Sequence, residues 1–203
     1  MNTTGAPAGA ISRRQLLQAG VAAFGGAAMH VHADDIGRVR PPIAAPALRL
    51  RGHDGRATTL TDALRGHATV VQLMFTGCSA ICPLQGVLFA SLQATLPVRG
   101  MADVQLLSLS IDPLGDDPKA LHAWLGRFAA GPAWRAAAPA PADLDRLLTL
   151  LGRDGLPATA STGDRHSGRL SLFDREARLV WRTADLPPTT EVIDALRWLR
   201  GQG

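Results

Sequence analysis

The run Ala68-Thr69-Val70-Val71-Gln72-Leu73-Met74-Phe75-Thr76-Gly77-Cys78-Ser79-Ala80-Ile81-Cys82-Pro83 sets the architecture of this chain. Six of its first eight residues are apolar, and three of the eight are β-branched, which is typical of a central strand buried on both faces. Pro83 then favours the first turn of a helix, and apolar residues follow it at helical spacing. The two cysteines, the only ones in 203 residues, are therefore expected at the exposed start of that helix.

The position of these two cysteines indicates reactive thiols. A helix N-terminus presents unpaired N–H groups, which lower the pKa of a nearby thiol and make thiolate available. Cys78 and Cys82 stand four residues apart, so they share one face of a helical turn. Such a pair can close a disulfide, whose Cα atoms lie roughly 4.4–6.8 Å apart, or bind one soft metal ion. These residues alone leave both uses open.

Strands and helices alternate along the rest of the chain. The pattern predicts an edge hairpin at residues 48–51 and 57–59, a second buried strand at 104–111, helices at 117–128 and 141–151, a hairpin at 170–173 and 179–181, and a closing helix at 190–200. A short strand is expected between the helices at 117–128 and 141–151, and residues 136–142, rich in alanine and proline, are expected to form only a loop. This order predicts a thioredoxin-like α/β fold, in which helices flank a central mixed sheet with an N-terminal hairpin.

The first 33 residues are expected to be a targeting segment. Ser12-Arg13-Arg14 precedes the apolar residues 16–28, and Val31-His32-Ala33 offers small residues for cleavage. This order is similar to a twin-arginine export signal, which would bring the protein to the periplasm. The apolar stretch is shorter than the roughly 20 residues of a membrane span, so we expect cleavage. An uncleaved leader would hold the protein close to the membrane.

The segment that follows the leader predicts the domain boundaries. Residues 34–47 contain three prolines and little hydrophobic pattern, so they are expected to form an extended linker. Residues 48–203 are then expected to form one folded domain.

Charge gives little indication of a partner. The formal net charge is +4, and two of the positive charges are Arg13 and Arg14 of the leader. The remainder carries 19 basic and 17 acidic residues, a net charge of +2, and no basic run interleaves with aromatic side chains. We therefore expect no nucleic-acid partner.

Four segments resemble the SCO/SenC family of copper-binding proteins that assemble cytochrome c oxidase. They are Phe75-Thr76-Gly77-Cys78-Ser79-Ala80-Ile81-Cys82-Pro83, Ser108-Leu109-Ser110-Ile111-Asp112-Pro113-Leu114-Gly115-Asp116-Asp117-Pro118, Gly131-Pro132-Ala133-Trp134, and Asp164-Arg165-His166-Ser167 with the later Phe173-Asp174. The resemblance extends over about residues 48–200. Dithiol oxidoreductases of this fold normally place two residues between their cysteines, whereas this chain places three.

The resemblance implies a site and a function. Cys78, Cys82 and His166 would bind copper, because two thiolates suit Cu(I) and an added imidazole lets the same set hold Cu(II). Asp112 would lie beside the metal-binding turn, although an Asp-Pro turn that only ends a strand explains this residue at least as well. The protein would be a periplasmic copper chaperone rather than an enzyme. Its client would be a respiratory oxidase subunit or another copper protein.

Other functions also fit the cysteine pair. A thiol-disulfide oxidoreductase that maintains client cysteines needs only Cys78 and Cys82, as a redox-active disulfide. An interaction module would use the same disulfide only to close a loop. A peroxidase of this fold is disfavoured, because its usual proline-threonine-x-x-cysteine setting is absent. The remaining histidines of the domain, His53, His67 and His122, are expected to be solvated.

Overall fold

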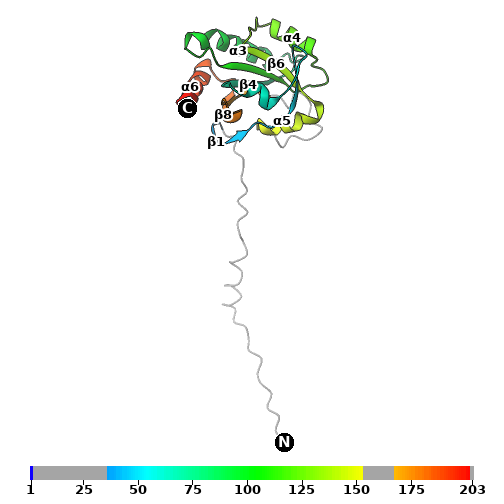
Figure 1. The fold of residues 1–203 in the computed structure, drawn as a ribbon, viewed down its shortest axis with the longest axis vertical. Helices are drawn as coiled ribbons and strands as arrows, with labels where there is room; N and C mark the ends of the chain where they lie inside the picture. Colours follow the sequence, from blue (N-terminus) through cyan, green and yellow to red (C-terminus); the bar gives the residue numbers. More distant parts are fainter. Residues whose placement is uncertain (2–35, 153–166, 202–203) are drawn as a thin grey trace. The chain divides into compact units, whose positions relative to one another are not determined.

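A computed structural model describes Met1 and residues 36–152 and 167–201, and within these ranges eight strands form one mixed sheet (Figure 1). The strands are β1 (Gly37–Ala44), β2 (Arg49–Gly52), β3 (Ala57–Thr59), β4 (Thr69–Met74), β5 (Gln105–Ser110), β6 (Trp134–Pro139), β7 (Arg169–Phe173) and β8 (Arg178–Asp185). Their order across the sheet is β1-β8-β7-β4-β5-β6-β2-β3. Strand β4 pairs with β5 in parallel and with β7 antiparallel. The predicted thioredoxin-like α/β class, with its mixed sheet, is confirmed.

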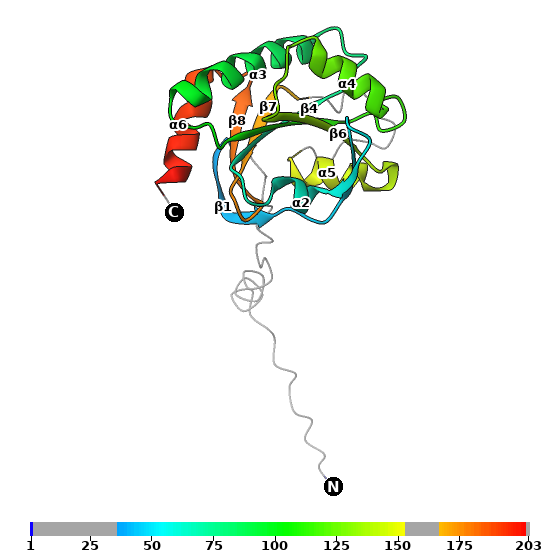
Figure 2. The same cartoon turned by 45° about the horizontal axis from the view of Figure 1, so that its top comes forward.

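Helices cover both faces of this sheet (Figure 2). One face carries α3 (Ile81–Val98), α4 (Pro118–Gly126) and α6 (Thr189–Arg200), whose buried side chains share one hydrophobic cluster. The other face carries α2 (Leu60–Leu64) and α5 (Leu144–Leu150), which follows a single 3₁₀ turn (Pro141–Asp143). This layering explains why all six residues of β4 are buried.

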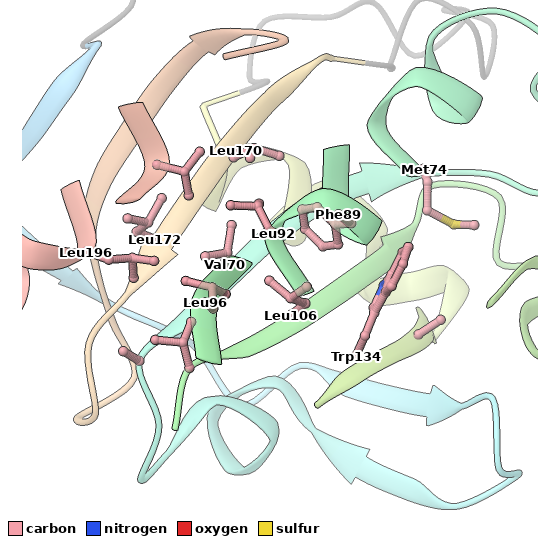
Figure 3. Close-up of a cluster of buried hydrophobic side chains, with 14 of the residues drawn as sticks. Val70, Met74, Phe89, Leu92, Leu96, Leu106, Trp134, Leu170, Leu172 and Leu196 are labelled. Atoms are coloured by element: carbon pink, nitrogen blue, oxygen red, sulfur yellow. The ribbon is translucent and has the colours of Figure 1, made fainter. Parts of the chain in front are cut away.

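The hydrophobic cluster beneath α3 holds this helix, whose first turn contains Cys82, against the sheet (Figure 3). Phe89 and Leu92 of α3 are fully buried against β4 and β6. The Phe89 ring lies 5.4 Å from the Trp134 ring, edge to face, between their centroids. Helix α3 is long and apolar enough to cross a membrane by length and composition. Its packing on the sheet identifies it instead as a core helix.

Most predicted elements are found where the sequence places them. The hairpins β2–β3 and β7–β8, the central strand β4, the parallel strand β5 and the closing helix α6 are all present. Helix α4 begins as expected, because the Asp117 side chain caps it by accepting a hydrogen bond from the Ala120 N–H at 2.7 Å. Met74 and Trp134 lie in the core.

Two segments differ from the prediction. Residues 37–44, expected to lie in a linker, form the edge strand β1, which pairs with β8, so the folded part begins before residue 48. The register shifts between Arg38 and Ile43, where the two prolines lack an N–H, and an edge strand tolerates this interruption. Residues 136–139, expected to form a loop, belong to β6, where small alanines fit between β5 and β2.

Gly86 of α3 allows a close approach that another residue would prevent. A Cβ atom at this position would lie 2.2 Å from Cζ of Phe128, and that ring stacks on Trp134 with the centroids 5.9 Å apart. We expect Gly86→Ala to lower the free energy of unfolding by about 1–2 kcal/mol, because overpacking outweighs the higher helix propensity of alanine.

Gly126 at the end of α4 is a matched control, because a Cβ atom added there would meet no described atom within 4 Å. Gly126→Ala should leave the free energy of unfolding unchanged or raise it by a few tenths of a kcal/mol. Urea unfolding of both variants measures the difference. Equal midpoints for the two variants would contradict the packing that we describe.

Candidate metal centre

The two cysteines lie at the carboxyl edge of the sheet, between β4 and α3. Cys78 lies in the connecting turn, where its backbone N–H donates to the Phe75 carbonyl at 3.2 Å. Cys82 lies in the first turn of α3. Both are free thiols in the structure. The sequence predicts exposure for both, whereas only Cys78 is partly exposed and Cys82 is fully buried in the α3 cluster.

The two thiols differ in their surroundings and therefore in acidity. Burial acts to raise the pKa of Cys78, but hydrogen bonds from the Cys82, Ala80 and Ile81 backbone N–H groups and from the Cys82 thiol outweigh it and lower the pKa below its ordinary value. Burial raises the pKa of Cys82 far above its usual range, and the nearby Cys78 and Asp116 add to this rise. Cys78 is thus the thiol that ionises first.

The turn between β4 and α3 that carries Cys78, called the cysteine turn below, is connected to the neighbouring strand β5 by the buried carboxylate of Asp116. This residue is 3% exposed and accepts a hydrogen bond from the Thr76 hydroxyl at 2.6 Å and another from the Thr76 backbone N–H. The Ser110 hydroxyl donates to its second oxygen at 2.6 Å. The neighbouring acid, Asp117, has a different role, because its side chain caps α4.

Asp112, the acid that the resemblance placed beside the metal-binding turn, makes its described hydrogen bonds with residues close to it in sequence, at the end of β5 and in the loop that follows. Its Oδ1 accepts a hydrogen bond from the Gly115 N–H at 3.1 Å, and its N–H donates to the Ser110 hydroxyl. These contacts fit the alternative in which an Asp-Pro turn ends the strand. The carboxylate that contacts the cysteine turn is therefore that of Asp116, which sequence reasoning missed.

The segment that enters β7 also reaches the cysteine turn. Gln72 of β4 pairs with Leu170 of antiparallel β7, so the start of β7 lies at the end of β4. The Ser167 carbonyl accepts a hydrogen bond at 3.1 Å from Nε2 of Gln85, three residues after Cys82. A Cβ on Gly168 would lie 2.8 Å from the Ile81 side chain, which shows how closely this backbone approaches α3.

The third expected ligand, His166, lies outside the described residues, and it directly precedes Ser167 in the sequence. Within residues 36–152 and 167–201, no group of three histidine, cysteine, aspartate or glutamate side chains is arranged to hold a metal ion. The histidines of this part lie elsewhere: the rings of His53 and His122 stack at 6.2 Å, and His67 precedes β4 at the opposite edge of the sheet. The described part therefore contributes the two sulfurs alone.

The donor atoms fit a soft metal ion. Cys78 and Cys82 approach closely enough for their thiols to hydrogen-bond, so both sulfurs can face one ion. Thiolate sulfur is the ligand that Cu(I) prefers, and binding displaces the proton that burial keeps on Cys82. A single buried thiol together with one more accessible thiol also fits a redox-active disulfide.

The difference between the thiols predicts a difference in reactivity. In Cys82→Ser, which keeps a hydroxyl donor beside Cys78, we expect iodoacetamide to alkylate Cys78 rapidly, with the half-maximal rate at a lower pH than for an unperturbed cysteine in a peptide, because the pKa of Cys78 is lowered. In Cys78→Ser, the buried Cys82 should react at least about ten times more slowly at about pH 7.5. Mass spectrometry over time measures both rates. Equal rates would contradict the thiol environments described above.

Comparison with known proteins identifies the family. The family model described as SCO1/SenC matches residues 41–200. A protein of Stutzerimonas stutzeri, named as a candidate copper-binding protein, is 31% identical over 122 residues, which are 59% of each chain. The match thus spans less than two thirds of that relative's length.

Solved structures share the fold. A SCO1/SenC family lipoprotein of Bacillus anthracis aligns with a TM-score of 0.67 and 23% identity, over 80% of this chain and 99% of the other. BsSco is named as a member of the Sco family of cytochrome c oxidase assembly proteins and is described with a disulfide switch. It aligns with a TM-score of 0.65 and 18% identity, over 80% of this chain and 96% of the other. Copper-bound ScoI of Bradyrhizobium japonicum aligns with a TM-score of 0.59 and 22% identity, over 77% of this chain and 99% of the other.

The family model accounts for every element from the middle of β1 to the end of α6, including the turn with both cysteines and the segment that enters β7. The chain belongs to the SCO1/SenC family.

Proposed function

We propose that the protein binds one copper ion through Cys78, Cys82 and His166 and delivers it to a copper protein of a respiratory oxidase. The observation that carries this proposal is the hydrogen bond from Gln85 to the Ser167 carbonyl at 3.1 Å. It holds the residue that follows His166 against the first turns of α3, close to Cys82. The proposed third ligand is the residue that directly precedes Ser167 in the sequence.

Gln85 provides a second argument for the imidazole ligand. Its Oε1 is buried and has no hydrogen-bond partner within the described part of the chain, although its Nε2 is bonded to the Ser167 carbonyl. A metal-bound histidine nearly always donates its other ring N–H to an acceptor, which fixes the orientation of the ring. The Gln85 oxygen is such an acceptor, and its amide already binds the residue next to His166. This arrangement supports a ligand role for His166.

The ligand set suits transfer as well as binding. Two thiolates favour Cu(I), and the imidazole allows the same site to hold Cu(II). Three ligands leave one side of the ion open to a donor atom of the client. Cys78 is partly exposed, and the apolar side chains of Leu84, Val87 and Leu114 near the turn are 57%, 62% and 86% exposed. Such a surface suits contact with a partner protein.

The relatives support copper as cargo and an oxidase as the client. The Stutzerimonas protein is named for copper binding, the Bradyrhizobium structure contains copper, and BsSco is grouped with cytochrome c oxidase assembly proteins. We extend these properties to this chain as part of the proposal. The proposed client is therefore the oxidase subunit that carries a copper centre.

We further propose that residues 1–33 export the protein to the periplasm, where copper is loaded. The twin-arginine pattern supports export, and the Bacillus anthracis family member is a lipoprotein, which is an exported and membrane-associated kind of protein. If the leader stays uncleaved, the same segment holds the protein at the membrane.

Removal of the imidazole tests the ligand set. We expect His166→Ala to weaken Cu(I) binding by about tenfold or more. Loss of a residue that only hydrogen-bonds to a metal ligand already lowers metal affinity by about this factor, and loss of the ligand itself should lower it at least as much. Disulfide formation between Cys78 and Cys82 should continue. Competition with a chromogenic Cu(I) chelator measures the affinity, and His67→Ala, at the opposite edge of the sheet, is the matched control. Unchanged affinity in His166→Ala would count against the site.

A thiol-disulfide oxidoreductase remains the second candidate, because a partly exposed thiol of lowered pKa next to a buried thiol is the arrangement that thiol exchange uses. This role would place the reduction potential of the pair between about −120 and −270 mV and would make His166 dispensable. Equilibration with glutathione or dithiothreitol buffers measures that potential.

Copper analysis of the reduced wild type and of Cys82→Ala distinguishes the two candidate functions. A copper chaperone binds one equivalent of copper per protein, and the variant loses it.

A further inference from the structure

Asp116 is the one carboxylate that joins the cysteine turn to the rest of the sheet among the described residues. Its oxygens accept the Thr76 backbone N–H at 3.2 Å, the Thr76 hydroxyl at 2.6 Å and the Ser110 hydroxyl at 2.6 Å. Ser110 is the last residue of β5, and Thr76 lies two residues before Cys78. The two loops at the carboxyl edge are thus connected through a single side chain.

The charge of this carboxylate is not neutralised within the described part of the chain. Asp116 is 3% exposed, and its hydrogen-bond donors there are neutral groups. In residues 36–152 and 167–201, none of the salt bridges includes it. Its Oδ1 is 2.6 Å from the hydroxyl of Thr76, which lies two residues before Cys78. A buried negative charge in this position favours a cation beside the sulfurs.

We propose that Asp116 is a positioning residue of the copper site, which fixes the turn that carries Cys78 and makes the site more favourable for Cu(II) than two thiolates and an imidazole alone would be. This inference deepens the proposed function and depends on it for the part that concerns copper. The role is assigned to Asp116 because its hydrogen bonds reach the turn that carries Cys78, whereas the described side-chain hydrogen bond of Asp112 is with Gly115.

The positioning effect follows from how the two cysteines are held. Cys82 is fixed by the packing of α3 in the core, whereas Cys78 depends on the turn that Thr76 begins. Loss of the Asp116 carboxylate removes all three hydrogen bonds that join this turn to β5 through that side chain. The separation of the two sulfurs would then vary, and a site whose ligands are not held in place binds its ion less tightly.

The charge effect distinguishes the two oxidation states. Coulomb attraction to a fixed carboxylate grows with the charge of the ion, so Asp116 stabilises Cu(II) more than Cu(I). Removal of the charge with retention of the hydrogen bonds should therefore weaken Cu(II) selectively. A residue with a purely structural role would affect both ions alike.

Asp116→Asn tests the charge. Asparagine has the same size, its oxygen can accept both Thr76 donors, and its amide can donate to the Ser110 hydroxyl. We expect Cu(I) affinity within about threefold of wild type and Cu(II) affinity at least about tenfold lower, as one unit of charge at short range implies. Asp117→Asn is the matched control, because this neighbouring acid caps α4 and should change neither affinity.

Asp116→Ala tests the positioning without any metal. In the reduced apoprotein, hydrogen exchange of the Thr76 amide should accelerate at least about tenfold relative to wild type, and alkylation of Cys82 should become faster as the turn loosens. Thr76→Val, which removes only the hydroxyl donor, serves as the milder variant if Asp116→Ala does not fold, and it should accelerate the same exchange to a smaller extent.

The outcomes separate this proposal from the proposed function. Equal losses of Cu(I) and Cu(II) affinity in Asp116→Asn, or a Thr76 exchange rate that neither Asp116→Ala nor Thr76→Val changes, would overturn the role of Asp116. If wild type binds no copper, the proposed function and the charge effect fail together, whereas the exchange and alkylation rates still decide whether Asp116 positions the turn.

Discussion

Strand β4 is the constraint on which the rest of the molecule depends. All six of its residues are buried, and it is hydrogen-bonded to β5 on one side and to β7 on the other. Its end point is therefore fixed, and three loops meet there: the cysteine turn that follows β4, the Asp116 loop that follows parallel β5, and the Ser167 segment that precedes antiparallel β7. Sheet topology brings these distant parts of the sequence to one edge, where open α/β sheets place their ligands.

Much of this fold could be predicted from the sequence, because local signals and tertiary structure agree in most segments. The apolar run of β4 and the Asp117-Pro118 start of α4 carry unambiguous patterns. The two segments that the sequence predicts wrongly, β1 and part of β6, have local explanations. The prolines of β1 argue against a strand, and only its place at the sheet edge makes them acceptable. The alanines of β6 carry little β propensity, but neighbouring strands leave room for small side chains there.

The site could be predicted only in part. Spacing identifies Cys78 and Cys82 as a pair, but it does not show that only Cys82 lies in α3, where packing in the core buries it, while Cys78 stays in the partly exposed turn before the helix. Sequence likewise offers three acids in the β5–α4 loop and does not indicate which one faces the cysteine turn. The loop geometry selects Asp116. The position of Ser167 beside α3 follows from the antiparallel register of β7, which has no local signal.

The central claim is that two sulfurs and one imidazole bind a single copper ion. X-ray absorption at the copper edge of the reduced, copper-loaded protein tests it most directly, because sulfur and nitrogen neighbours scatter differently. We predict two sulfur neighbours and one imidazole nitrogen for wild type, and loss of the imidazole signal alone in His166→Ala. A wild-type spectrum with sulfur neighbours only, unchanged in that variant, would contradict the account.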